Sequence, residues 1–191
     1  MEIIHTLNQI DQQVFLILNG LHTTFLDTIM WYISSKTLWY PFYIVLIYFI
    51  ILKRKKDVWI TFLAIILMII LSDQLADLVK DYMQRLRPSH NPDLSGLVHT
   101  LRGYTGGEYG FVSSHASNAF AVAAFTALFF QRKWFVYSIF IWAVIVSFSR
   151  IYLGVHYPLD VICGGMLGMS IGVFIYYLEH WAIRKINKMD T

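Results

Sequence analysis

The sequence predicts an all-α protein, a six-helix transmembrane bundle preceded by an amphipathic helix that lies along the membrane interface. Of the 191 residues, 57% are hydrophobic and only 14% are charged, whereas soluble domains average roughly 25% charged residues. A chain of this length cannot bury so much apolar surface in one core, because small domains leave much of their surface exposed. The apolar residues also fall in long runs, which is typical of membrane spans.

The elements follow one another along the chain, and residues 1–191 are expected to form a single domain. Residues 3–18 are amphipathic and are expected to lie along the membrane interface. The last apolar run opens with Pro158, which suits the first turn of a helix. The six expected spans are residues 24–35, 38–52, 58–83, 115–130, 134–151 and 158–178.

Basic residues cluster in the links that follow the second, fourth and sixth spans. These clusters lie at residues 53–56, 132–133 and 184–188. Because basic links favour the cytoplasmic side, we expect a multi-pass membrane protein with both termini in the cytoplasm. The polar segment 88–112 is then expected on the periplasmic or extracellular face.

Five basic residues contradict this charge bias, because they lie at or near the outer face. Lys80, Arg87 and Arg150 each lie at a helix end beside other polar residues. Cations held there indicate an anionic ligand. Arg85 and Arg102 are interpreted as solvated loop charges or contacts with lipid headgroups.

Three polar clusters carry the candidate chemistry. Asp73, Asp77, Lys80, Gln84 and Arg87 follow at steps of four, three, four and three residues, which places them on one face of a helix. This face is a polar stripe within an apolar span. Ionisable groups at membrane depth normally face a pocket or a partner.

The second cluster opens the fourth span, and the third precedes and opens the sixth. Ser113, Ser114 and His115 follow a glycine-rich run, and the start of a helix offers free N–H groups to an anion. Asp160 follows His156 by four residues. The carboxylate can therefore accept the proton of one imidazole nitrogen and leave the other as a nucleophile.

Small residues recur at four-residue spacing in the last span. Gly164, Gly168 and Gly172 form such a ladder. This spacing allows helix backbones to approach closely, so we interpret the ladder as a packing surface.

The three polar clusters together resemble the three-part signature of the type 2 phosphatidic acid phosphatase (PAP2) superfamily. One position departs from it, because Ser114 stands where the family has glycine, which removes backbone freedom there. The resemblance covers residues 58–178 and rests on Lys80-x6-Arg87-Pro88, Ser113-Ser114-His115 and Ser149-Arg150-x5-His156-x3-Asp160.

The resemblance implies a lipid phosphatase of the bacterial cytoplasmic (inner) membrane that needs no cofactor and no metal ion. His156 would attack phosphorus to give a phosphohistidine, and Asp160 would fix its tautomer. His115 would protonate the leaving oxygen and then activate water. The phosphate would be bound by Lys80, Arg87, Ser113, Ser114 and Arg150.

The expected partners are the bilayer and a lipid phosphate or diphosphate. Candidates are undecaprenyl diphosphate, phosphatidylglycerol phosphate, phosphatidic acid and a lipid A phosphate, with the polyprenyl and phospholipid substrates favoured. Alternatives are a lipid phosphotransferase with the same site, a non-enzymatic lipid-binding protein, or a transporter with a relay through Asp73, Asp77 and Lys80. The net charge of +3 gives no indication of nucleic-acid binding, and the oligomeric state is left open.

Overall fold

A computed structural model describes residues 2–189 of the chain, and within them it contains seven α-helices and no β-strand. The all-α prediction is confirmed, and each of the six expected spans contains a helix. The helices are α1 (Glu2–Asn19), α2 (Thr24–Ser34), α3 (Tyr40–Arg54), α4 (Val58–Met83), α5 (Ser114–Phe130), α6 (Lys133–Tyr152) and α7 (Pro158–Met189).

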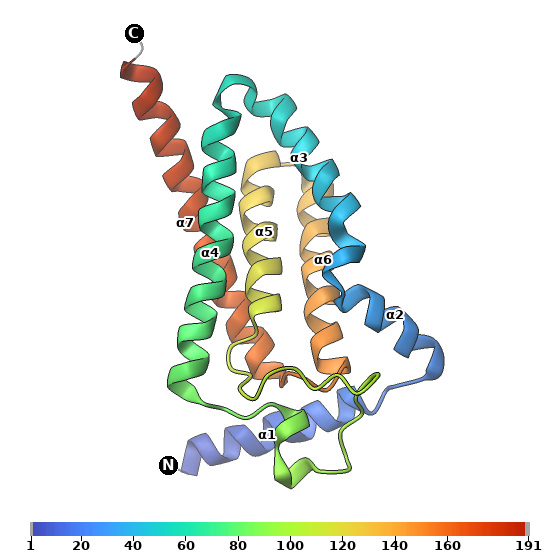
Figure 1. Cartoon of the computed structure of the whole chain (residues 1–191). Helices are drawn as coiled ribbons and strands as arrows, with labels where there is room; N and C mark the ends of the chain where they lie inside the picture. The colour runs from blue at the N-terminus through green and yellow to red at the C-terminus, as the bar shows by residue number, and fades with distance from the viewer. Residues whose placement is uncertain (1, 190–191) are drawn as a thin grey trace.

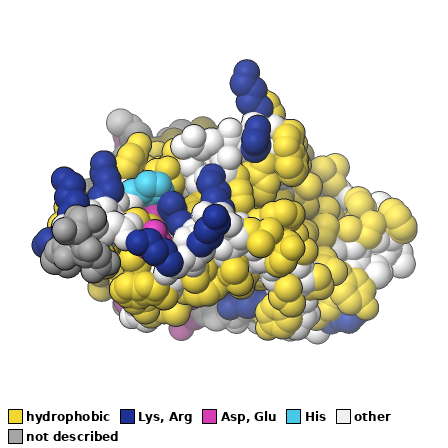
Figure 2. Space-filling model, turned by 90° about the horizontal axis from the view of Figure 1, so that it is seen from above, with side chains coloured by type: hydrophobic (Ala, Val, Ile, Leu, Met, Phe, Trp, Pro, Cys, Tyr) yellow, Lys and Arg dark blue, Asp and Glu magenta, His cyan; other side chains and the backbone are white. Residues whose placement is uncertain are grey.

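Helices α3 to α7 run alternately up and down the long axis of the bundle, and α1 lies across its lower end (Figure 1). We call the lower end, where α4 ends and α5 begins, the site end. The opposite end carries the three basic clusters at residues 53–56, 132–133 and 184–188, and we call it the basic end. Figure 2 shows lysine and arginine side chains gathered on this end.

By length and apolarity, three stretches of the described residues qualify as membrane spans: 36–83, 133–152 and 158–188. The first contains both α3 and α4, which the basic link 55–57 joins as an antiparallel pair. Helix α5 is apolar and shorter, with 17 residues. The bundle therefore has the composition of a multi-pass membrane protein along its whole length.

Helix α2 differs from the expectation in one respect, because both of its ends lie at the site end. The N–H of Thr23 donates to Tyr152 Oη at 3.1 Å, and Ser34 contacts Arg150. An 11-residue helix rises about 16 Å, roughly half of the ~30 Å hydrocarbon core. The expectation that both termini share one side is therefore wrong for residues 2–189, whose first residue lies at the site end and whose last lies at the basic end (Figure 1).

The contact between α5 and α7 is made by backbone atoms. A Cβ atom at Gly168 would lie 1.9 Å from the carbonyl oxygen of Ser117, and one at Gly172 would lie 2.4 Å from that of Ala121. No side chain larger than hydrogen fits at these distances. The glycine ladder is thus a packing surface, as predicted.

Helix α4 ends earlier than its polar stripe does. Gln84 adopts a left-handed conformation with φ 46° and caps the helix after Met83. Leu86 then pairs with Tyr109 in an isolated antiparallel bridge. Arg87 therefore does not lie on the helix face with Asp73 and Lys80, but reaches the site from the segment that follows.

Candidate active site

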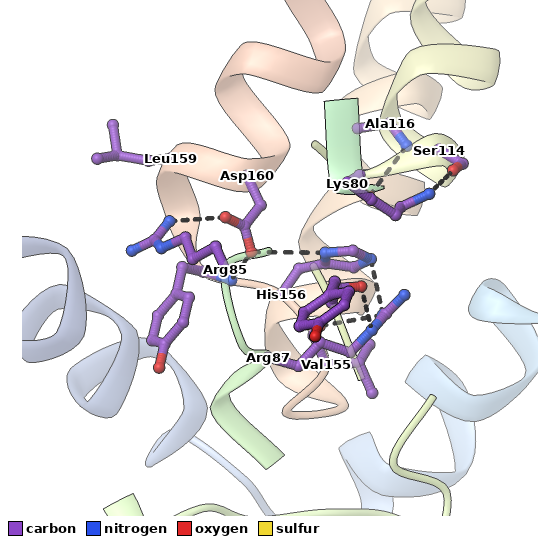
Figure 3. Close-up of polar contacts among 12 residues, drawn as sticks. Lys80, Arg85, Arg87, Ser114, Ala116, Val155, His156, Leu159 and Asp160 are labelled. Carbon is purple, nitrogen blue, oxygen red and sulfur yellow. Dashed lines mark hydrogen bonds and ion pairs between the residues drawn. The ribbon is translucent and has the colours of Figure 1, made fainter. Parts of the chain in front are cut away.

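The three sequence clusters meet at the site end, where α4 and α6 end and α5 and α7 begin, and Figure 3 shows the labelled residues pointing toward one another. Lys80 comes from the last turn of α4, and its Nζ contacts Ser114 Oγ at the start of α5. Arg87 Nη1 lies 3.0 Å from Nε2 of His156, which lies between α6 and α7. Residues from all three motifs are therefore in direct contact.

Arg87 is held by backbone oxygens on two sides. Its Nε donates to the carbonyl of Tyr109 at 3.0 Å, and its Nη1 donates to the carbonyl of Val155 at 3.1 Å. The glycine-rich segment wraps around the guanidinium, since a Cβ at Gly106 would lie 3.0 Å from Arg87 Nη1. Gly106 has a φ of +71°, which favours glycine for a second reason.

Arg150 is 3% exposed and is oriented by two hydroxyl groups. It donates to Tyr104 Oη at 3.0 Å and contacts Ser34 Oγ at the end of α2. Its Nε has no hydrogen-bond partner in the described part of the chain. Sequence reasoning missed Ser34, because a serine in an apolar segment 116 residues away carries no signal of this contact.

His156 is buried, and its tautomer follows from its neighbour. Because an arginine N–H can only donate, Nε2 of His156 accepts from Arg87, and in the neutral ring Nδ1 carries the proton. Nδ1 lies 3.5 Å from Asp160 Oδ2, too far for a strong hydrogen bond. Burial, together with the charges of Arg87, Arg150 and Lys80, lowers the pKa of His156 well below its usual value. The imidazole is therefore neutral at pH 7.

Asp160 is fixed by partners other than His156. Its Oδ2 accepts from the backbone N–H of Tyr157 at 2.8 Å, and its Oδ1 accepts from Arg85 Nη1 at 2.6 Å. Its carboxylate nevertheless faces the imidazole (Figure 3). Asp160 is thus placed beside the N–H of the histidine, as the four-residue spacing predicted.

The interpretation of Arg85 as a solvated loop charge is wrong. Its guanidinium bridges two buried carboxylates, donating to Asp160 and, at 2.7 Å, to Asp11 Oδ2 on α1. It also lies over the ring of Tyr157, 4.3 Å from the centroid. Asp11 in turn accepts from the N–H of Leu159 at 3.0 Å. The sequence offered one indication of this role. Asp11 is an acidic residue on the N-terminal amphipathic helix, and its carboxylate needs a cationic partner once that helix packs against the bundle.

The two serines that open α5 have different roles. Ser113 is fully buried, and its hydroxyl accepts from the N–H of Ala116 at 3.4 Å as the cap of the helix. Its own N–H donates to the carbonyl of Asp160 at 3.0 Å. Ser114 instead lines the cavity, together with His115. Of the two serines, Ser114 is therefore the one that lies at the cavity.

A cavity of 520 Å³ extends from these residues into the bundle between α3, α4, α5 and α6. Arg87, Ser114, His115, Arg150 and His156 line its polar end. Its other walls are mainly apolar and aromatic, and they include Tyr43, Leu46, Ile50, Ile65, Met68, Val122, Phe125 and Trp142. Within residues 2–189, no three histidine, cysteine or carboxylate side chains are grouped so as to hold a metal ion.

A profile of the PAP2 superfamily matches residues 57–184, which include all of these motifs. The chain belongs to the PAP2 superfamily. It is 36% identical to the lipid A 4'-phosphatase of Porphyromonas gingivalis over 91% of this chain and 75% of that protein. It is 30% identical to an undecaprenyl-diphosphatase of Sulfolobus acidocaldarius over 93% of this chain and 82% of that protein.

A solved structure agrees with this assignment. The crystal structure of Aquifex aeolicus LpxE superimposes with a TM-score of 0.68 at 25% identity, covering 86% of this chain and 93% of that one. The superfamily, the phosphatase class and the multi-pass membrane placement expected from the sequence are confirmed. This PAP2 protein is a phosphatase whose bundle brings the residues of the three sequence motifs together at one end.

Proposed function

We propose that this PAP2 phosphatase hydrolyses the phosphate ester of a membrane lipid through a phosphohistidine on His156. One observation carries the proposal: Arg87 and Arg150 are both buried at the same cavity, Lys80 contacts Ser114 beside them, and neither arginine has a carboxylate partner within residues 2–189. Removing a cation from water without a counter-charge is costly. A phosphoryl group supplies that charge, and its oxygens match the guanidinium fork.

The first step transfers the phosphoryl group to the enzyme. Arg87, Arg150 and Lys80 bind the phosphoryl oxygens, and the Ser114 hydroxyl and the free N–H groups of the α5 N-terminus assist. Nε2 of His156 attacks phosphorus, so a P–N bond forms as the bond to the leaving oxygen breaks. His115, which lines the same cavity, is protonated once the phosphoryl anion is bound beside it and gives that proton to the leaving oxygen. Ser113 contributes by capping the helix that presents these groups.

The second step returns the enzyme to its starting state. His115, now neutral, accepts a proton from water, whose oxygen attacks the phosphorus. The P–O bond forms, the P–N bond breaks, and inorganic phosphate leaves. Asp160 balances the positive charge that the imidazole carries while it is phosphorylated. The proton on Nδ1 stays beside this carboxylate throughout.

The cavity suits a substrate with a polar phosphate and an apolar tail. Its polar end carries the phosphate-site residues, and its apolar walls extend between α3 and α5 at the depth of the bilayer. The 36% identity to a lipid A 4'-phosphatase over most of the chain supports an acylated sugar phosphate as the substrate. The match to an undecaprenyl-diphosphatase is weaker, at 30%.

The basic end supports an orientation in the bacterial cytoplasmic membrane. Basic links favour the cytoplasm, so the clusters at 53–56, 132–133 and 184–188 face inward. The site end then faces the outer leaflet, and a lipid enters it from that leaflet. In this orientation the C-terminus is cytoplasmic, while the N-terminus is on the outer side.

The test is phosphate release from lipid substrates by purified protein in detergent with EDTA. The wild type is expected to release phosphate and to give an acid-labile, base-stable phosphoenzyme on rapid quenching with labelled lipid. His156→Ala is expected to do neither, whereas the matched control His180→Gln, at the basic end, retains both. Equal phosphate release by His156→Ala and wild type contradicts the proposal. Label transferred to an added lipid alcohol instead of water identifies a phosphotransferase.

A further inference from the structure

The phenol of Tyr104 is an accessible hydroxyl group at the polar end of the cavity. Tyr104 lines this cavity together with Arg87, Arg150 and His156. The tyrosine is 37% exposed, whereas Arg150 beside it is only 3% exposed. The hydrogen bond between the two residues is partly buried, so the open side of this contact is that of the phenol. A ligand in the cavity can therefore reach the Tyr104 hydroxyl.

The direction of the phenolic hydrogen follows from the contact with Arg150. Because an arginine N–H can only donate, Nη2 of Arg150 donates to Tyr104 Oη, which lies 3.0 Å away. The hydrogen on Oη must therefore point away from the guanidinium. Within residues 2–189 it has no acceptor. Tyr104 thus offers the cavity a hydrogen-bond donor that the described chain leaves unused.

Three cations act on this donor. Burial raises the pKa of the Tyr104 phenol, but the charges of Arg150, Arg87 and Lys36 outweigh burial, so the pKa lies below its usual value of about 10. Lys36 opens the turn that precedes α3, and it lines the same cavity. A phenol that is more acidic is a stronger hydrogen-bond donor. The surroundings of Tyr104 therefore favour an anionic acceptor.

The position of the phenol is fixed by its own segment and by α2. The backbone N–H of Tyr104 donates to the carbonyl of Leu101 at 2.9 Å, and Leu101 is buried. Gly103 between them has a φ of +70°, which favours glycine at this turn. Trp31 of α2 packs edge-on against the phenol ring, with centroids 6.1 Å apart. The hydroxyl is therefore placed before a ligand binds, as a donor to developing charge should be.

A phosphoryl oxygen matches this donor better than an alcohol oxygen does. An alcohol oxygen satisfies the hydrogen bond alone, whereas a phosphoryl oxygen also balances the neighbouring cations. Oη of Tyr104 lies 3.0 Å from Nη2 of Arg150. A phosphoryl group bound by that guanidinium is therefore within reach of the phenol.

We propose that Tyr104 is a further catalytic residue, which donates its phenolic hydrogen bond to a non-bridging phosphoryl oxygen of the substrate. The phenol keeps its proton throughout, and its hydrogen bond strengthens as negative charge builds on the phosphoryl oxygens in the transition state. Arg150 polarises the hydroxyl by donating to it. The inference rests on the proposed function and adds a donor to its phosphate site.

The first experiment removes the hydroxyl with Tyr104→Phe. We expect kcat/KM to fall roughly 10- to 100-fold, the effect of one hydrogen bond to a charged group. The loss should be the same for a lipid phosphate and for p-nitrophenyl phosphate, because the contact is with the phosphoryl group that both share. The unfolding temperature in detergent should remain close to that of the wild type, because the ring that packs against Trp31 is kept.

The second experiment separates donation to substrate from the positioning of Arg150. In the wild type, kcat/KM should fall at high pH with a midpoint below 10, because a phenolate cannot donate. Tyr104→3,5-difluorotyrosine keeps the hydroxyl but makes it more acidic. Below its midpoint this variant should work at nearly the wild-type rate, and the midpoint itself should move to lower pH.

Tyr152→Phe is the matched control. Its hydroxyl also lies at the site end, where it donates to Asp27 at 2.7 Å, but Tyr152 does not line the cavity. This variant should keep the high-pH midpoint of the wild type.

Three results overturn the inference and leave the proposed function standing. They are an unchanged rate for Tyr104→Phe, a loss confined to the lipid substrate, and a high-pH midpoint that the fluorinated residue does not move. The second result assigns Tyr104 to the headgroup, and the third limits it to positioning Arg150. No phosphate release from any lipid by the wild type instead contradicts the proposed function.

Discussion

The two sides of helix α5 are packed in different ways. Toward α7, the backbones touch, and the glycines of α7 lie directly against carbonyl oxygens of α5. Toward α3, the same helix faces the 520 Å³ cavity. Only Leu46 and Ile50 of α3 are buried, and Ile44 is 65% exposed.

This difference in packing assigns a different task to each side of α5: one side positions the site residues, and the other leaves space for a lipid tail. Ser114 and His115 begin α5, Asp160 lies in the first turn of α7, and His156 lies just before that helix. The tight contact between α5 and α7 fixes these groups relative to each other, as the proposed phosphoryl transfer requires. The loosely packed side gives a lipid tail room to lie beside them. Variants on the two sides should therefore fail in different ways.

The largest effect is expected on the tight side, for Gly168→Val. The added Cβ alone would lie 1.9 Å from a backbone oxygen of α5, so the helices must separate. We expect a loss of about 3 kcal/mol or more in stability, measured as a lower unfolding temperature in detergent. Gly107→Ala is the control, because a Cβ there meets open space. An unchanged unfolding temperature for Gly168→Val contradicts the described contact.

Arg85→Met is expected to have the next largest effect, because it leaves Asp11 and Asp160 without their shared cation. Removing one partner from buried ion pairs costs about 3 kcal/mol. Arg85 acts on the reaction through Asp160, so kcat should fall roughly 10- to 100-fold with little change in KM. Arg85→Lys should recover part of the rate. Arg102→Met, which removes a cation over Trp31, is the comparison, and an equal loss of kcat there argues against a role for Arg85 in positioning.

On the open side, Val122→Phe is expected to reduce the space for the lipid tail. Val122 lines the cavity beyond Asn118. We expect kcat/KM for a long-chain lipid phosphate to fall about tenfold, a loss of roughly 1.4 kcal/mol. Hydrolysis of p-nitrophenyl phosphate should be unchanged. If both substrates are affected alike, the cavity is not where the tail binds.

The smallest effect concerns pH. The pKa of His156, the proposed nucleophile, is lowered by burial and by the charges of Arg87, Arg150 and Lys80, so its imidazole stays neutral below the usual pKa of about 6.5. The acid limb of kcat/KM should therefore have its midpoint below pH 6.5. A histidine with an unshifted pKa would lose roughly 90% of its neutral form at pH 5.5. A midpoint at or above 6.5 is incompatible with this environment for the nucleophile.

The same pKa shift affects stability. In the unfolded chain, His156 binds a proton as the pH falls through its usual value of about 6.5. In the folded chain it remains neutral there, because its pKa is lowered. Its contribution to stability is therefore present above pH 6.5 and is lost as the pH falls below that value.

The helices and most of the site were predictable because their signals are local. Each apolar run predicts a helix. The glycine ladder and the four-residue step from His156 to Asp160 predict which side chains share one helix face, and both patterns lie within a few turns. The orientation of α2 was not predictable in this way, because the apolar composition of a segment does not show whether the segment crosses the bilayer. Its position is set by contacts such as that of Ser34 with Arg150.

The role of Arg85 escaped sequence reasoning for the same reason. Its partners Asp11 and Asp160 lie 74 and 75 residues away in opposite directions along the chain. Nothing in the local sequence distinguishes it from Arg102, which lies over an aromatic ring instead. Only the packing of α1 across the end of the bundle brings the two carboxylates together.

The contact of Asp11 with Leu159 has a consequence for the order of assembly. The two residues are 148 positions apart, so the first helix meets its partner only after most of the chain has been synthesised. Until then, Asp11 lacks the N–H donor of Leu159, and Arg85 lacks the carboxylate of Asp160. Enzymatic activity should therefore arise only after the start of α7 has been inserted, when this segment and α1 meet.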